Sequence, residues 1–104
     1  PGFEVTGWFG LFAPAGLPKR IAGAEVSVDR VVRLLAAAQR DGFDASFLFC
    51  IDTSGTPVDV EVLRTTGIVQ IDATIMTSLR EARYEPPPAK TCTLERRSLW
   101  LPSR

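Results

Sequence analysis

The chain has 104 residues, 45% of them apolar, and its 12 basic and 12 acidic residues give a net charge of zero. This length predicts a single domain, or a single domain with a tail. The neutral balance argues against a dedicated nucleic-acid binder, which usually carries a basic stripe. We therefore interpret local pairs of charge such as Arg96 and Arg97 as a solvated strand face.

The chemistry of the side chains disfavours an enzyme. The chain contains no histidine, so Ser-His-Asp and Cys-His catalytic arrangements are impossible. Its two cysteines, Cys50 and Cys92, do not complete a zinc site by themselves. Lys19 and Lys90 lie near prolines in expected loops, and the acidic residues are scattered. We expect a domain that is not an enzyme and that uses neither a cofactor nor a metal ion.

We predict that residues 1–26, which are rich in aromatic residues, glycine and proline, form an arm, and that residues 27–104 form the domain proper. We expect the arm to pack its rings on the domain; the alternative is a strand that pairs with another molecule. The aromatic residues concerned are Phe3, Trp8, Phe9 and Phe12. The chain starts at Pro1 without methionine, which indicates an excised or processed chain. Neither a signal peptide nor a bilayer-spanning run is visible, so a membrane anchor, if one exists, lies outside this chain.

The spacing of apolar residues predicts a first helix over residues 28–40, most simply part of the core scaffold. Its expected apolar stripe consists of Val28, Val31, Val32, Leu35 and Ala38. Ser27 suits the N-cap, and Asp29 suits the positive end of the helix dipole. We expect Gly42 to adopt the left-handed conformation that ends a helix.

Two segments of period two follow and predict a β-hairpin. The expected apolar faces consist of Phe47, Phe49 and Ile51 on the first strand and of Val58, Val60 and Val62 on the second. Residues 52–56, Asp-Thr-Ser-Gly-Thr, have the composition of a hairpin turn. Pro57 is expected at the first position of its strand, where little ladder bonding is lost.

A second helix is expected over residues 71–83, after a turn that pivots on Gly67. Its apolar stripe consists of Ile71, Ile75, Leu79 and Ala82, and it would cover the valine face of the hairpin. Asp72 near one end and Arg80 and Arg83 near the other complement the helix dipole.

The sequence RYEPPP, residues 83–88, ends this helix abruptly. Proline forces the preceding residue out of the helical region, and three prolines in a row keep the chain extended. The segment therefore sends the chain back along the sheet as a third strand, in which Leu99 and Leu101 alternate with Ser98 and Trp100. These elements predict an α+β fold: a small antiparallel three-stranded sheet with two helices packed on one face, in the order arm-α-β-β-α-β.

Four stretches in this order resemble the C-terminal domain of the TonB family of energy transducers, over residues 47–101. They are FCIDTSG, VDVEVLRTTG, IDATIMTSLREARYEP and SLWLP. The helix end carries what resembles the family's aromatic-proline motif, here Arg83, Tyr84, Glu85 and Pro86. The resemblance implies a periplasmic domain that takes part in transport and grips a peptide from an outer-membrane receptor.

In this family the peptide adds as a strand beside the last strand of the sheet. The resemblance implies a binding edge that here comprises Thr93, Leu94, Glu95, Arg96, Arg97, Ser98, Leu99, Trp100 and Leu101. An unpaired sheet edge can accept an extended peptide through main-chain hydrogen bonds. We expect Arg96, Arg97 and Trp100 to contact the peptide; the alternative is an edge that these charges protect or that the arm covers.

Three further possibilities remain open at this point. If the first and third strands are neighbours, as in the resembled family, a disulfide between Cys50 and Cys92 is geometrically reasonable; otherwise these are two independent thiols. The same edge can instead pair with a second copy of the chain, giving a homodimer. Finally, residues 2–19 of the arm resemble a stretch of tripartite-tricarboxylate-type periplasmic solute-binding proteins, which would imply a small-molecule binder.

Overall fold

The computed structural model describes residues 18–23 and 25–102. The expectations for the aromatic residues of the arm, and most of the segment 2–19, lie outside this range. The elements, in chain order, are β1 (Arg20–Ala22), α1 (Val28–Ala37), β2 (Gly42–Ile51), β3 (Pro57–Arg64), α2 (Val69–Glu81), β4 (Arg83–Tyr84) and β5 (Thr91–Trp100).

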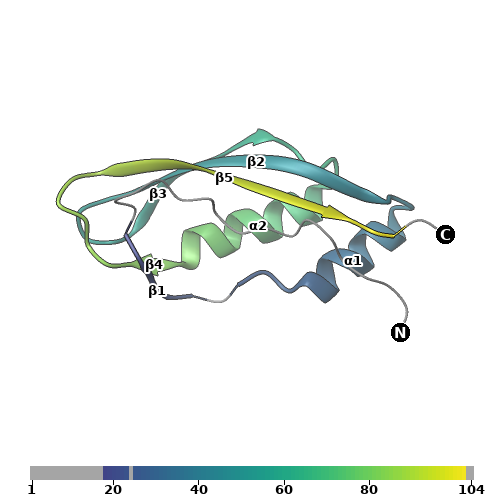
Figure 1. Cartoon of the computed structure of the whole chain (residues 1–104), viewed down its shortest axis with the longest axis horizontal. Coiled ribbons are helices and arrows are strands. Elements are labelled where there is room, and N and C mark those ends of the chain that lie inside the picture. The colour runs from purple at the N-terminus through teal and green to yellow at the C-terminus, as the bar shows by residue number, and fades with distance from the viewer. Residues whose placement is uncertain (1–17, 24, 103–104) are drawn as a thin grey trace.

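The main sheet has three antiparallel strands in the order β3-β2-β5. Figure 1 shows this sheet as one layer and both helices as a second layer on one side of it. The predicted α+β class and the arrangement of three strands and two helices are therefore confirmed. A second sheet, formed by the short strands β1 and β4, was not predicted from the sequence.

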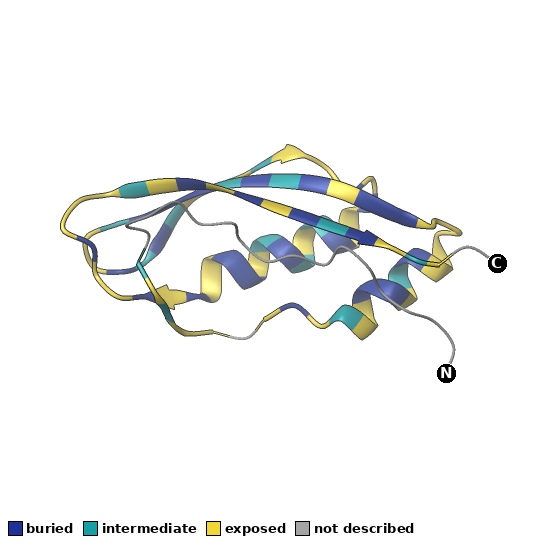
Figure 2. Cartoon of the chain, viewed as in Figure 1, coloured by how far each residue is buried: buried dark blue, intermediate teal, exposed yellow. Residues whose placement is uncertain are grey.

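The core lies between the sheet and the helices. Along β5 and the middle of β2, buried residues alternate with exposed or half-buried ones, as Figure 2 shows. This is the period expected when one face of a sheet is covered and the other is exposed. The largest fully buried side chains on these strands are those of Phe47, Phe49, Ile51 and Leu99.

Helix α1 begins where the sequence predicts and ends earlier. The hydroxyl of Ser27 accepts a hydrogen bond from the N–H of Arg30 at 3.3 Å, which confirms the N-cap. The expectations for Ala38 and Gly42 are wrong. Ala38 is the exposed C-cap, and the left-handed residue that follows it is Gln39, with φ of 56°. Gly42 is instead the first residue of β2, where a Cβ would collide with the ring of Trp100.

The hairpin turn forms as predicted. The Asp52 carboxylate accepts hydrogen bonds from the N–H groups of Ser54 and Thr56, at 2.9 and 3.0 Å, and Gly55 has φ of 85°. One detail of the second strand is wrong. Asp59, at φ of 54°, lies in a β-bulge that places Val58 opposite Cys50. Only Val60 and Val62 pack against the core.

Helix α2 packs against β3 through the predicted stripe, all of whose members are buried. The turn before it confirms Gly67, with φ of 86°, as the pivot. Asp72 fixes this turn because its carboxylate accepts from the N–H and the hydroxyl of the buried Thr66, at 2.8 and 2.7 Å, and from the hydroxyl of Thr65. The acidic residue near the helix start therefore also holds the turn that leads into it.

Helix α2 ends at Glu81, two residues before the predicted end, so Arg83 lies in the short strand β4 and not in the helix. Ala82 is already extended, with ψ of 153°. The N–H of Tyr84 then donates to the carbonyl of Gly55 in the hairpin turn at 3.0 Å, and the N–H of Glu85 donates to the carbonyl of Lys19 at 2.9 Å. The RYEPPP segment thus ties the hairpin turn and the residues before β1 to the end of α2.

Candidate functional site

Strand β5 forms one edge of the main sheet, because β2 lies on one side of it and no described strand pairs with the other side. Its register with β2 runs without interruption from Gly42 opposite Trp100 to Ile51 opposite Thr91. The sequence expectation of a last strand at an edge therefore agrees with the strand order.

The direction of each backbone group on β5 follows from two observations. The Cα atoms of Cys50 and Cys92 are 3.9 Å apart, the close spacing of a pair that does not exchange hydrogen bonds. The N–H of Leu101 donates to the carbonyl of Asp41 at 2.7 Å, one step beyond the end of the ladder. Because the pattern alternates, odd-numbered residues of β5 bond to β2, and even-numbered residues direct N–H and C=O toward the open edge.

Leu94, Arg96 and Ser98 are therefore the central residues whose backbone faces outward. Each presents one donor and one acceptor on the side away from β2. Such a row is the template that an additional strand requires. The sequence placed these residues within the expected edge, but it did not separate them from the intervening residues that bond to β2.

The opposite edge of the sheet, β3, is much less regular. Its pairing with β2 shifts twice, between Ser46 and Phe47 and between Leu48 and Cys50. The first position of the strand is proline, which has no N–H. Bulges and proline are features that interrupt the template of an edge strand. The two edges therefore differ, and β5 is the one that can continue the ladder.

The inner side of β5 carries a buried ion pair. Arg97 and Glu95 are 2% and 3% exposed, and their side chains are joined by contacts of 3.0 to 3.1 Å. Arg97 also contacts the carboxylate of Glu25 at 3.1 Å, and Glu25 in turn contacts Arg20 at 3.1 Å. The expectation that Arg96 and Arg97 share a solvated face is therefore wrong: Arg96 is exposed, whereas Arg97 points to the interior.

Burial and the neighbouring arginines shift the pKa values of the two carboxyls of this cluster in opposite directions. It raises the pKa of Glu95 above its ordinary value, although the charge and hydrogen bond of Arg97 oppose that shift. Burial also opposes ionisation of Glu25, but Arg97, the N–H of Val26 and Arg20 together outweigh it and lower the pKa of that carboxyl. The pKa of Tyr84 is raised by burial and by the charge of Glu95.

In the helix-end motif that resembles the TonB family, Arg83 and Tyr84 make contacts that hold the end of α2 and the core together. The guanidinium of Arg83 donates to the carbonyls of Arg80 and Ala82, at 3.1 and 2.8 Å, at the end of α2. The ring of Tyr84 lies against that of Phe49, with centroids 6.1 Å apart. Glu85 and Pro86 are exposed and lead the chain away from β4. Of these residues, Tyr84 is the one whose pKa is raised, first by burial and then by the charge of Glu95 on β5.

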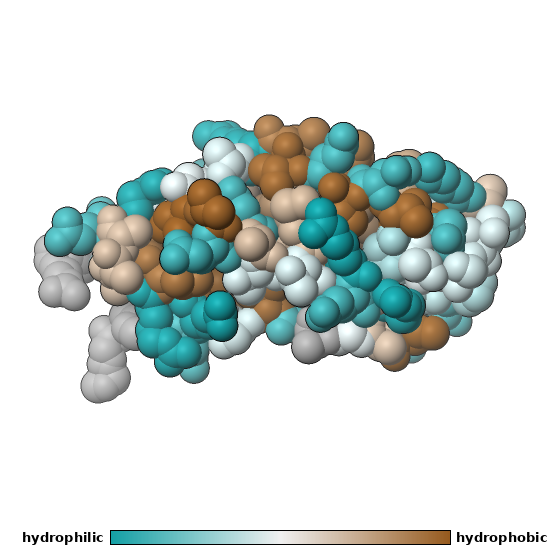
Figure 3. Space-filling view, turned by 180° about the vertical axis from the view of Figure 1, so that it is seen from behind, coloured by the Kyte–Doolittle hydropathy of each residue, from teal (hydrophilic) through white to brown (hydrophobic). Residues whose placement is uncertain are grey.

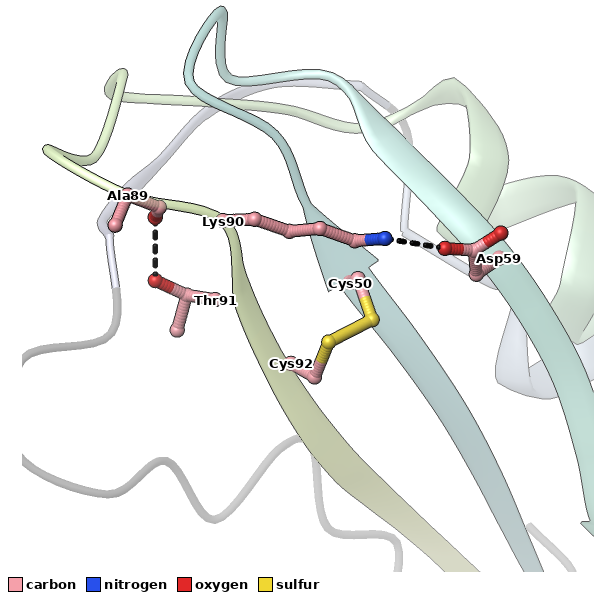
Figure 4. The surroundings of a disulfide bond; sticks show 6 residues. All are labelled: Cys50, Asp59, Ala89, Lys90, Thr91 and Cys92. Atoms are coloured by element: carbon pink, nitrogen blue, oxygen red, sulfur yellow. Dashed lines mark hydrogen bonds and ion pairs between the residues drawn. A yellow bond between two sulfur atoms is a disulfide. The ribbon is translucent and has the colours of Figure 1, made fainter.

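Cys50 and Cys92 form a disulfide directly across β2 and β5. Figure 4 shows it on the exposed face of the sheet, where Lys90 reaches past it toward Asp59 on β3. The Nζ of Lys90 and a carboxylate oxygen of Asp59 are 2.7 Å apart. Both side chains are more than half exposed, so this ion pair contributes little stability, whereas the disulfide fixes the register of β5 covalently.

Comparison with protein-family models, with curated proteins and with solved structures finds no match to this chain. The resemblance to the TonB family therefore stays a hypothesis that rests on the four sequence stretches.

Neither helix of the described chain has the length and apolarity that a bilayer crossing requires. On the face that Figure 3 shows, apolar side chains form separate patches with hydrophilic ones between them.

Proposed function

We propose that this domain binds an extended peptide segment of another protein by adding it as a strand to the edge of β5. The observation that carries the proposal is the uninterrupted ladder between β2 and β5, which leaves the backbone groups of Leu94, Arg96 and Ser98 directed outward. Main-chain hydrogen bonds at such an edge contribute about 0.5–1.5 kcal/mol each. Strand addition is a recurrent mode of peptide recognition.

The proposal extends to the cellular setting. A disulfide forms and persists in oxidising compartments, so the Cys50–Cys92 bond fits a location outside the cytoplasm. The sequence resembles the C-terminal domain of TonB transducers, and on that basis we assign the domain to the periplasm, to a transport system and to a peptide from an outer-membrane receptor. The role is one of binding rather than catalysis.

A proline substitution on β5 separates strand addition from binding elsewhere. Leu94→Pro removes an N–H that points to the edge, and proline is tolerated at such positions of an edge strand. Leu94→Ala is the matched control, since it loses the same side chain but keeps the N–H. Titration with a synthetic extended peptide, followed by amide NMR, should show saturable shifts along β5 in the unmodified chain and in Leu94→Ala.

Leu94→Pro should bind at least about threefold more weakly than Leu94→Ala, because a main-chain bond is lost. Equal affinity of the two variants would contradict strand addition at this edge. Pairing of β5 with a second copy is the other outcome that would oppose the proposal; it would appear as a dimer in sedimentation and as edge amides protected before any peptide is added.

A further inference from the structure

The two cysteines of the disulfide differ in their exposure. Cys50 lies on the central strand β2 and is 5% exposed, whereas Cys92 lies on the edge strand β5 and is exposed. Both lie on the open face of the sheet, on the side away from the helices (Figures 1 and 4). An incoming thiolate therefore meets two unequal halves of one bond.

The side of Cys50 that faces away from Cys92 is covered by β3. Val58 is aligned with Cys50 on that side and is half-buried. The Nζ of Lys90 lies 2.7 Å from the carboxylate of Asp59, the residue after Val58. Because Lys90 directly precedes β5 and Asp59 is on β3, this ion pair spans the central strand β2 in the region of Cys50 (Figure 4). The ion pair thus adds to the cover over this cysteine.

The strand order also gives the bond a preferred direction of attack. A thiolate displaces a disulfide sulfur in line with the bond that breaks. Cys50 and Cys92 face each other directly across β2 and β5, so the line of attack on Cys92 starts at the outer edge of β5. No described strand lies there. The line of attack on Cys50 starts over β3, where Val58 and the ion pair lie.

Attack at Cys92 releases Cys50 as a thiolate, and Lys90 provides a cation for it. A nearby positive charge stabilises a thiolate. The Lys90 side chain is 54% exposed and its ammonium is held by an ion pair at the surface, so it can turn toward Cys50 at little cost. The carboxylates on this part of the face are those of Asp59, which is paired with Lys90, and Glu61, one row away from Cys50 on β3.

We propose that the Cys50–Cys92 bond is a thiol–disulfide exchange site for a dithiol protein, which attacks Cys92 while the domain stays folded. The partner's thiolate bonds to the sulfur of Cys92, the bond between the two cysteines breaks, and Cys50 leaves as a thiolate that takes up a proton. The partner's second thiol then loses its proton and displaces Cys92, which is protonated in turn. The partner ends as a disulfide and the domain as two thiols. This inference does not depend on strand addition.

The first test identifies the cysteine that is attacked. The full oxidised chain is mixed with a reduced thioredoxin-type protein whose second active-site cysteine is replaced by serine, so that the mixed disulfide accumulates. Acid quenching, alkylation, digestion without reductant and mass spectrometry then locate the partner. The mixed disulfide should form at Cys92 at least about tenfold more often than at Cys50. Equal amounts at both cysteines, or an excess at Cys50, would overturn the proposed direction.

A second measurement separates attack on the folded chain from reduction after unfolding. The rate of reduction by dithiothreitol is measured at urea concentrations below the unfolding transition. Direct attack predicts a nearly constant rate. Reduction of the unfolded chain predicts a rise of about fivefold or more per molar urea, in step with the unfolded population. Such a rise would overturn the exchange site, as would failure of the folded chain to react while the unfolded chain does.

The contribution of Lys90 is tested with Lys90→Met, which keeps most of the side-chain length and removes the charge. Exchange at Cys92 should slow by about two- to fivefold, and added salt should narrow the difference. Arg33→Met is the charge-matched control and should leave the rate unchanged, because Arg33 is exposed on α1, on the other side of the sheet. An unchanged rate in Lys90→Met would overturn the role of the lysine but leave the exchange site standing.

Discussion

Loss of the disulfide should greatly weaken the fold. Cys50 and Cys92 are separated by 42 positions in the sequence, and closing a loop of this length stabilises the folded state by about 4 kcal/mol in the chain-entropy model. Domains of this size have total stabilities of about 5–15 kcal/mol. Reduction should therefore remove a large share of the stability and lower the melting temperature by about 15–30 °C.

The measurement is urea unfolding of the oxidised and the reduced chain, followed by circular dichroism. Reduction changes no side-chain volume, so it isolates the cross-link. The double variant Cys50→Ala/Cys92→Ala should match the reduced chain to within about 1–2 kcal/mol, the difference reflecting the smaller side chain at the buried position 50. Alkylation and mass spectrometry without reductant should detect no free thiol in the oxidised chain.

Equal unfolding free energies of the oxidised and reduced chains would refute the reasoning. Such a result would mean either that the reduced, unfolded chain already keeps these strands close together, or that strain from the cross-link in the folded state offsets its stabilising effect. Two free thiols in the chain purified without reductant would refute the disulfide itself.

Three other substitutions test separate parts of the structure by urea unfolding. Gly55→Ala should cost about 2 kcal/mol or more, because φ is 85° and a Cβ would collide with the carbonyl oxygen of Tyr84; an effect below about 0.5 kcal/mol would contradict that contact. Arg97→Met should cost about 3–5 kcal/mol, because it leaves Glu95 buried without this partner, and Glu95→Met combined with it should restore much of the loss; failure of the double variant to recover would contradict the pairing. Glu25→Gln should destabilise the fold at about pH 7 and have little effect at about pH 3. The folded pKa of Glu25 lies below its ordinary value of 4.5, so its contribution is present above that value and is lost as the pH falls through the folded pKa. Equal effects at both pH values would show that charge is not the cause.

The sequence predicts the number and type of the main elements well, because each carries a complete local signal. The stripe from Ile71 to Leu79 and the turn at Asp52 need no distant partner to be recognised. The α+β class and the edge position of the last strand followed from these signals and from the TonB resemblance. The end of α1 was less well predicted, because the left-handed residue that follows it is Gln39 rather than a glycine, and α2 begins and ends two residues earlier than the predicted 71–83.

Other features depend on contacts that a single segment does not reveal. Position 42 has no room for a Cβ, because the ring of Trp100, more than 50 residues away in the sequence, occupies that space. The burial of Arg97 depends on the register of β5 against β2 and on the carboxylates of Glu95 and Glu25. The expectation of one solvated face for Arg96 and Arg97 overlooked that neighbouring residues of a strand point to opposite faces; strict alternation along β5 was the signal that separates the exposed arginine from the buried one.

The most direct test of strand addition is residue-resolved amide exchange along β5. In the free chain, the outward amides should exchange rapidly and the amides bonded to β2 slowly; the outward set is Leu94, Arg96 and Ser98, and the bonded set is Thr93, Glu95 and Leu99. Addition of the extended peptide should slow exchange of the outward set alone. Outward amides that are already protected in the monomeric free chain would contradict an open edge, and an unchanged pattern at saturating peptide would contradict strand addition at β5.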